Sequence, residues 1–357
     1  MAFPANGQPH LRPGAIERNP SVAEVDPALR LDELWAEFLD ASASIINDVT
    51  AGVYAYDWGR FRAWLDGAGA GPVLAAISRQ VLVDYIAELM TRPKAKGTGT
   101  LSRHSVQHYV RPVRTFLRWC VGEGYYPADP FAGPRGIMPH LGPRILKTAT
   151  AQDLPILLEG TDEAKARNPL ERATRVRDRL IVLLGADTGL RTGEVCRLRI
   201  RDVQLDGGYL EVHESKWDNE RIVPISPEVR AAVRRYLRRG RSVLTRREGD
   251  AVAPDEPLFL GRLAEPLTEN GLYQALCRAY ARGGGTGRFG LHRLRHFFGS
   301  EVQRRGMQLG IAKELMGHED IKTTNGYTHV TVEEAMLAHA KATPLHALPP
   351  ARRRRLA

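Results

Sequence analysis

Two arginines in the second half of the sequence stand where a phosphate could be bound. Arg191 follows a glycine-containing turn that begins at Asp187 and precedes a helical pattern, so its guanidinium would lie near a helix N-terminus. Arg295 follows His292 by three residues, and this spacing puts both side chains on one face of a helix. Guanidinium groups bind phosphate oxygens through paired hydrogen bonds, and an imidazole exchanges protons near neutral pH. These residues could therefore hold a phosphodiester and move a proton beside it.

A tyrosine, a lysine and a further histidine extend this set. Tyr327 follows His318 by nine residues, in a polar segment rich in turn-forming residues where no apolar face is evident. Lys216 lies at the tip of a predicted β-hairpin. A phenol has a pKa of about 10, so a tyrosine becomes a nucleophile only when cationic neighbours favour the phenolate or a base removes its proton. With such neighbours, Tyr327 could attack a phosphorus atom.

Each of these residues also has an ordinary structural interpretation. Arg191 could pair with Glu194 in solvent, and a lysine at a hairpin tip is commonly solvated. The basic helix that carries His292 and Arg295 could lie against water or DNA without doing chemistry. A lone tyrosine is usually a packing residue. The order and spacing of the whole set must therefore decide the interpretation.

Composition limits the class of protein. The 357 residues, 43% of them apolar, exceed one ordinary core and predict two domains. Lys and Arg outnumber Asp and Glu by 51 to 41, which favours a polyanionic partner such as nucleic acid, although a basic protein with a solvated surface fits equally well. The three cysteines, Cys120, Cys196 and Cys277, are far apart and form no zinc or redox motif. With neither an apolar run of membrane length nor a signal peptide, we expect a cytoplasmic protein with no membrane partner.

The elements that must position the candidate residues fall into two domains with tails. Residues 1–28 are proline-rich and aperiodic, which predicts a flexible tail. Apolar residues at helical spacing predict a helical bundle over 29–132, and a Pro/Gly-rich linker follows over 133–147. The candidate residues lie in a second domain, 148–345. Four consecutive arginines mark 346–357 as a basic tail that could touch phosphates nonspecifically.

The second domain is predicted to be mostly helical with a small antiparallel sheet. Thr150 and Asp153 have the spacing of a capped helix start, and a further helix is expected over 177–185. The pattern over 207–224 predicts a β-hairpin with a polar tip. A last helix over 332–345 has Ala335, Met336 and Ala340 at helical spacing. The sequence does not decide whether that helix packs on its own domain or on a neighbouring protomer.

In their order, the candidate residues resemble the tyrosine recombinase, or phage integrase, family. Its catalytic pattern is Arg, Lys, His-x-x-Arg, His or Trp, and then Tyr. Flanking runs sharpen the resemblance, T-G-L-R-x-x-E-V around the first arginine and G-H-x-x-x-x-T-T-x-x-Y-T-H around the tyrosine. The resemblance covers about 147–345 strongly and 31–135 more loosely. The six matching residues are Arg191, Lys216, His292, Arg295, His318 and Tyr327.

This resemblance implies a mainly α fold: a SAM-like helical core-DNA-binding domain and a mostly helical α+β catalytic domain with a small antiparallel sheet, together forming a clamp around DNA. It implies a site-specific recombinase that cleaves and rejoins DNA strands through a 3′-phosphotyrosyl intermediate, for integration, excision or resolution of a DNA element. The two arginines would hold the phosphate, and Lys216 would protonate the departing 5′-hydroxyl. His292 would exchange a proton with Tyr327 while His318 hydrogen-bonds the phosphate, roles that could be exchanged.

The same resemblance bears on partners. Because the phosphotyrosyl link conserves the energy of the broken bond, neither a cofactor nor a metal is implied. Exchange between two duplexes implies a tetramer on double-stranded DNA, with the helix over 332–345 docked on the neighbouring protomer. An accessory DNA-bending or directionality protein is compatible with this scheme. The short tail over 1–28 departs from integrases that carry a separate arm-site-binding domain.

Two other functions fit parts of the pattern. A type IB topoisomerase uses a similar set of residues to relax supercoils, although the bundle, the linker and the segment around Tyr327 favour recombination. A DNA-binding regulator could have kept the fold without catalysis, although all six positions are intact. A covalent protein–DNA adduct would separate the second alternative from an enzyme.

Overall fold

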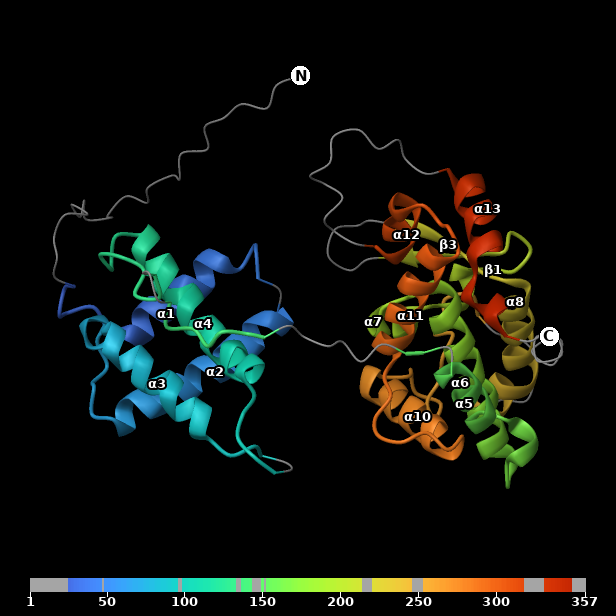
Figure 1. Cartoon of the computed structure of the whole chain (residues 1–357), viewed down its shortest axis with the longest axis horizontal. Helices are drawn as coiled ribbons and strands as arrows, with labels where there is room; N and C mark the ends of the chain where they lie inside the picture. The colour runs from blue at the N-terminus through green and yellow to red at the C-terminus, as the bar shows by residue number, and fades with distance from the viewer. Residues whose placement is uncertain are drawn as a thin grey trace, which may run out of the picture. The chain divides into compact units, whose positions relative to one another are not determined.

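The structure is a computed structural model, and it divides into two compact units, Met1–Ile145 and Leu146–Ala357 (Figure 1). The proposed tail over 1–28 lies outside the described residues except for its last four, as do much of the linker over 133–147 and most of the basic tail over 346–357. The described ranges are 25–46, 48–95, 98–132, 136–142, 149–150, 152–213, 220–245, 253–317 and 331–348.

In the described part of the first unit, four α-helices form the bundle that the sequence predicted. They are α1 Leu31–Ser42, α2 Asp48–Gly67, α3 Arg79–Thr91 and α4 Arg103–Gly122. Serine side chains cap the last two, since Ser78 accepts from the Val81 N–H at 3.3 Å and Ser102 from the Ser105 N–H at 3.1 Å. Capping of this kind fixes where each helix begins.

Aromatic side chains fill the core of this bundle. The rings of Trp35 and Trp58 are stacked, with centroids 4.3 Å apart, and Phe116 packs edge-on against both. Phe61 and Tyr85 continue the cluster between α2 and α3. Stacked and edge-to-face pairs add about 0.5–1.5 kcal/mol each beyond the burial of their area. The aromatic cluster thus joins all four helices.

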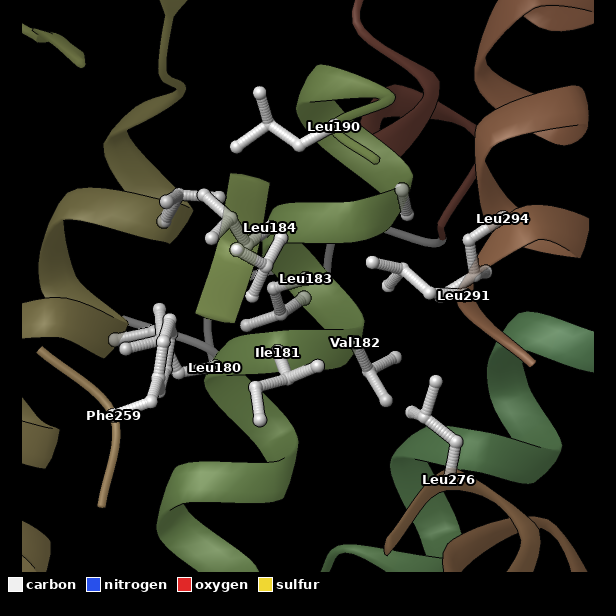
Figure 2. Close-up of a cluster of buried hydrophobic side chains, with 14 of the residues drawn as sticks. Leu180, Ile181, Val182, Leu183, Leu184, Leu190, Phe259, Leu276, Leu291 and Leu294 are labelled. Atoms are coloured by element: carbon white, nitrogen blue, oxygen red, sulfur yellow. The ribbon is translucent and has the colours of Figure 1, made fainter. Parts of the chain in front are cut away.

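The second unit is built around α6, Pro169–Thr188, whose last thirteen residues are all buried except Arg179. Figure 2 shows the leucine, isoleucine and valine side chains of 180–184 pointing in different directions around the helix. A helix that is apolar all round must be surrounded. The helices that surround it or follow it are α5 Asp153–Gly160, α7 Thr192–Arg197, α8 Pro227–Arg235, α9 Ser242–Thr245, α10 Glu269–Arg282, α11 Leu291–Arg304, α12 Leu309–Met316 and α13 Val332–Ala342.

The predicted helix over 177–185 is a part of α6, which begins eight residues earlier. Its start is defined by Asn168, whose side chain accepts from the Glu171 N–H at 2.8 Å, and by Pro169 in the first turn. The first two turns are rich in charged residues, so the apolar pattern does not extend over them. Polar residues at a helix start therefore hid the true length of α6.

A small antiparallel sheet lies beside these helices, with strand order β1-β2-β3. The predicted hairpin is confirmed as β2, Tyr209–His213, paired with β3, Glu220–Pro224, in the register Leu210 to Val223. A third strand, β1, Val203–Gln204, was not predicted because two residues show no alternation. The fold class expected from the sequence, mostly helical with a small antiparallel sheet, is confirmed.

The C-terminal helix α13 packs on its own unit. Ala335 and Ala342 are buried in a cluster with Phe298 and Leu315, and His339 is buried on the same face. Of the other two residues expected on that face, Met336 is half-buried and Ala340 is exposed. No helix within the described ranges combines the length and the apolar character needed to cross a lipid bilayer.

Candidate active site

The turn between α6 and α7 positions Arg191. Gly189 has φ +64°, a left-handed conformation that favours glycine, and a Cβ built there would lie 2.5 Å from Cδ1 of Phe298. Arg191 then precedes the first residue of α7, and its N–H donates to Oε2 of Glu194 at 2.7 Å. The sequence correctly predicted an arginine at a helix start.

Arg295 lies on α11 and is buried, with 5% of its surface exposed. Its Nη1 atom donates to the carbonyl oxygen of Gly189 at 2.7 Å, so it holds the turn that carries Arg191. His292 lies nearly one turn earlier on α11 and is exposed, and its ring meets that of His296 with centroids 4.7 Å apart. The structure therefore joins the two candidate arginines, Arg191 and Arg295, through one short turn.

Three arginines from different elements meet at the C-terminal end of α12. The last carbonyl groups of a helix have no partner within it and carry partial negative charge, so they attract cations. Gly317 ends the helix with φ +64°. The donor and acceptor pairs are Arg221 Nε to Leu315 O at 3.0 Å, Arg295 Nη2 to Met316 O at 2.7 Å, and Arg191 Nη2 to Gly317 O.

Glu194 balances part of this positive charge. Its carboxylate accepts from Nη1 of Arg191 at 2.9 Å and from Nη2 of Arg221 at 3.0 Å. Burial opposes ionisation of Glu194, but the hydrogen bond and charge of Arg221, followed by those of Arg191, outweigh it and lower its pKa. The Arg191–Glu194 pair considered from the sequence is thus present, but the carboxylate is buried while 39% of the Arg191 side chain is exposed. Two cations beside one carboxylate leave this site positively charged.

The remaining candidates, Lys216, His318 and Tyr327, lie outside the described residues. His318 directly follows Gly317 in the chain. Sequence reasoning missed Arg221 and gave Glu194 no role beyond a surface pair. In the sequence, Arg221 belongs to the predicted hairpin and to an Arg-Ile-Val-Pro run that adds to the family resemblance, and nothing local indicates its distant partners.

Comparison with known proteins gives consistent findings. Residues 151–334 match the phage integrase family. Tyrosine recombinase XerD of Pseudomonas aeruginosa is 29% identical over 318 residues, which are 88% of this chain and 95% of that protein. The integrase of the transposon Tn1549, in complex with a circular intermediate DNA, has a TM-score of 0.60 at 18% identity, covering 87% of this chain and 98% of that one. A lambda integrase tetramer bound to a Holliday junction has a TM-score of 0.55 at 18% identity, covering 83% of this chain and 76% of that one. The two structures bear on the fold, and they match the mostly helical architecture described above.

Proposed function

The chain belongs to the phage integrase family, and from this premise we propose that it recombines specific DNA sites through a 3′-phosphotyrosyl link formed by Tyr327. It is a tyrosine recombinase, an enzyme that cleaves and rejoins DNA strands. The observation that carries the finer proposal is the meeting of Arg191 and Arg295 at the end of α12, directly before His318. Integration, excision and resolution of a DNA element are all reactions of this kind.

The proposed chemistry needs a nucleophile, charge neutralisation and a proton for the leaving oxygen. Arg191 and Arg295 would bind the nonbridging oxygens of the phosphate, where negative charge grows in the transition state. The phenolic oxygen of Tyr327 would attack phosphorus, and the bond from phosphorus to the 5′-oxygen would break. Lys216 would give that oxygen its proton. Rejoining reverses these steps, so the scheme requires neither a metal nor ATP.

We propose that His292 and His318 serve the same phosphate. His292, exposed on the helix of Arg295, is suited to exchange a proton with the tyrosine. His318 would hydrogen-bond a phosphate oxygen, and these two roles could be exchanged.

The first unit is proposed as the core-DNA-binding domain, spanning 29–132, with the catalytic domain spanning 148–345. Helix α4 supports this, because it contains no Asp or Glu and its apolar face is buried. Its exposed face carries Arg103, His104, His108, Arg111, Arg114 and Arg118. Four arginines along a helix face that has no acidic residue of its own suit the phosphate backbone of a duplex.

We further propose that both domains bind the same duplex as a clamp, in the cytoplasm. Exchange of two duplexes needs four active sites, so self-association into a tetramer on DNA is proposed as well. The lambda integrase tetramer bound to a Holliday junction supports that assembly. An accessory DNA-bending or directionality protein would be an additional partner.

A covalent-trapping experiment tests the proposal. The protein is incubated with a library of DNA from its own genomic neighbourhood and denatured, and DNA attached to protein is recovered and sequenced. We expect an adduct that is lost in Tyr327→Phe and kept in Tyr209→Phe, a matched change in β2. Binding without any adduct would favour a noncatalytic DNA-binding protein, and relaxation of plasmids that lack the site would favour a topoisomerase. An adduct that persists in Tyr327→Phe would place the nucleophile elsewhere.

A further inference from the structure

We propose that Arg221 is a positioning residue for strand cleavage. It ties Glu194 to the C-terminal end of α12, and so it holds Arg191 in position and keeps the charge of Arg191 available to the phosphate. This inference rests on the proposed function of Arg191. It assigns to Arg221 no contact with the reacting atoms.

The contacts of Arg221 join three segments that are distant in sequence. Its side chain, 12% exposed, extends from β3, donates through Nε to Leu315 O at 3.0 Å and through Nη2 to Glu194 Oε2 at 3.0 Å. A planar guanidinium can donate in both directions at once, whereas the ammonium of a lysine is a point donor on a flexible stem. Arg221 therefore fixes the distance between α7 and the end of α12.

Arg191 binds the same two partners from another side. It donates to Oε1 of Glu194 at 2.9 Å and to the carbonyl oxygen of Gly317, two residues beyond the one that Arg221 holds. Any shift of α12 relative to α7 would therefore pull Arg191 with it. Because Arg295 holds Met316, such a shift would also change the spacing of the two phosphate-binding arginines.

Charge gives a second reason for the role of Arg221. Glu194 is buried, with 3% of its surface exposed, and a buried carboxylate must be balanced by cations. With Arg221 present, two guanidiniums share this one negative charge. Without Arg221, Glu194 would draw on Arg191 alone, and the charge of Arg191 would be largely neutralised before a phosphate arrives. Arg221 thus leaves the pair of guanidiniums around Glu194 with a net positive charge that a phosphate can use.

The experiment measures single-turnover formation of the covalent adduct at saturating DNA. The probe is a synthetic duplex of the site recovered in the trapping experiment. For Arg221→Gln we expect a rate loss on the order of 100-fold, the size of effect that a displacement of about 1 Å can produce. Arg221→Lys should recover part of the rate because it keeps the charge. The matched control, Arg234→Gln, removes the same charge from the same unit at an exposed pair with Asp206 and should leave the rate unchanged.

A double variant separates this role from general damage. Arg221→Gln leaves Glu194 paired with Arg191 alone, so Glu194→Gln in the same chain removes the anion that competes with the phosphate for Arg191. The combined loss should therefore be smaller than the product of the two single losses. The proposal would be overturned if the rate losses of the two single variants simply multiply in the double variant while the variants lose thermal stability to equal extents. If Arg221→Gln does not fold, the Lys variant and the double variant decide by the same rates.

A substrate with sulfur in place of the bridging 5′-oxygen distinguishes positioning from proton donation. A thiolate leaves without needing a proton, so this substrate should restore cleavage in Lys216→Ala. It should not restore cleavage in Arg221→Gln, because the defect there lies in the placement and charge of Arg191. Restoration in Arg221→Gln, or a wild-type rate of that variant on the ordinary duplex, would overturn the assignment. Failure of the proposed function would look different, since wild type itself would then form no adduct through Tyr327.

Discussion

The imidazole Nε2 atom of His339, in the C-terminal helix α13, lies 2.8 Å from the carbonyl oxygen of Asp187, the residue before the last of α6. It also lies 3.4 Å from the Asp187 carboxylate, which accepts from the Ser226 N–H at 2.7 Å and from the Thr343 hydroxyl. Both partners of the ion pair are buried. Because Asp187 lies in the last turn of α6, shortly before the turn that carries Arg191, the C-terminal helix is hydrogen-bonded to an element that supports the candidate active site.

The pH dependence of this contact follows from two pKa shifts. Burial disfavours the charged form of His339, but the charge and hydrogen bonds of Asp187 outweigh it and raise the pKa of His339 above its ordinary 6.5. Burial also opposes ionisation of Asp187, yet His339, Thr343 and Ser226 lower its pKa below the ordinary 3.8. The stabilisation from His339 is therefore complete below its ordinary pKa and is lost as pH rises through the raised value. The stabilisation from Asp187 is lost only as pH falls below its ordinary pKa.

We therefore expect α13 to loosen on the alkaline side. Hydrogen–deuterium exchange over 331–348, corrected for the intrinsic effect of pH, should increase as pH rises above the ordinary histidine pKa of 6.5. His339→Gln should show faster exchange that no longer depends on pH. An unchanged pH dependence in that variant would mean that another group controls the docking of this helix.

Replacing the carboxylate of Asp187 should lower the stability of the second unit by more than the loss of one hydrogen bond would. In Asp187→Asn, the buried His339 would lose its counter-ion and must release its proton or remain charged, and breaking a buried pair in this way costs about 3–5 kcal/mol. Four of the five tryptophans lie in the first unit, so far-ultraviolet circular dichroism, compared with tryptophan emission, separates the unfolding of the two units. We expect the transition of the second unit alone to move to lower temperature. Adding His339→Gln to Asp187→Asn should lower the stability of the second unit by less than His339→Gln does alone. A fully additive loss of stability would contradict the pairing of the two residues.

The glycine before Leu190 gives a prediction about activity. Gly189→Ala would put a Cβ into a left-handed backbone conformation and against Phe298, at the residue whose carbonyl oxygen Arg295 holds. The conformation alone costs about 1–2 kcal/mol. We expect adduct formation to slow because the turn that carries Arg191 must move. The control is Gly59→Ala in α2, where the added Cβ would meet nothing within 4 Å beyond its chain neighbours and the backbone of its own helix. It should stabilise the first unit by about 0.5–1 kcal/mol and leave cleavage unaffected.

Most of the fold could be predicted from the sequence where one face of an element is apolar. The buried residues of α2, α3 and α4 repeat at helical spacing, and alternation along β2 marks its buried face. The start of α6 and the whole of β1 could not be predicted in this way. The former is charged, and the latter has too few residues to show a pattern.

The candidate active site likewise has features that the sequence predicts and contacts that it does not. The positions of Arg191 at a helix start and of Arg295 on the helix of His292 are local, so a motif predicts them. The contact of Arg221 with Leu315 spans 94 residues of sequence, and that of His339 with Asp187 spans 152. An arginine on a strand or a histidine on a helix carries no local sign of such a partner. Only the packing of distant elements brings these pairs together.

The basic face of α4 yields a prediction about DNA affinity. Each phosphate neutralised by a lysine or arginine releases counterions, which contributes about 0.9 to the slope of log affinity against log salt concentration. If Arg111, exposed on this face, contacts a phosphate, Arg111→Gln should weaken binding at low salt and reduce the slope by about that amount, whatever the DNA sequence. Arg92→Gln removes the same charge from the residue that follows α3, where Arg92 is paired with Glu88 at 2.9 Å, and should leave the slope unchanged. Fluorescence anisotropy of a labelled duplex across a salt series measures both variants. Equal slopes for Arg111→Gln and wild type would place the DNA on another face of the bundle. Equal changes of slope in Arg111→Gln and Arg92→Gln would mean that only the net charge of the protein matters.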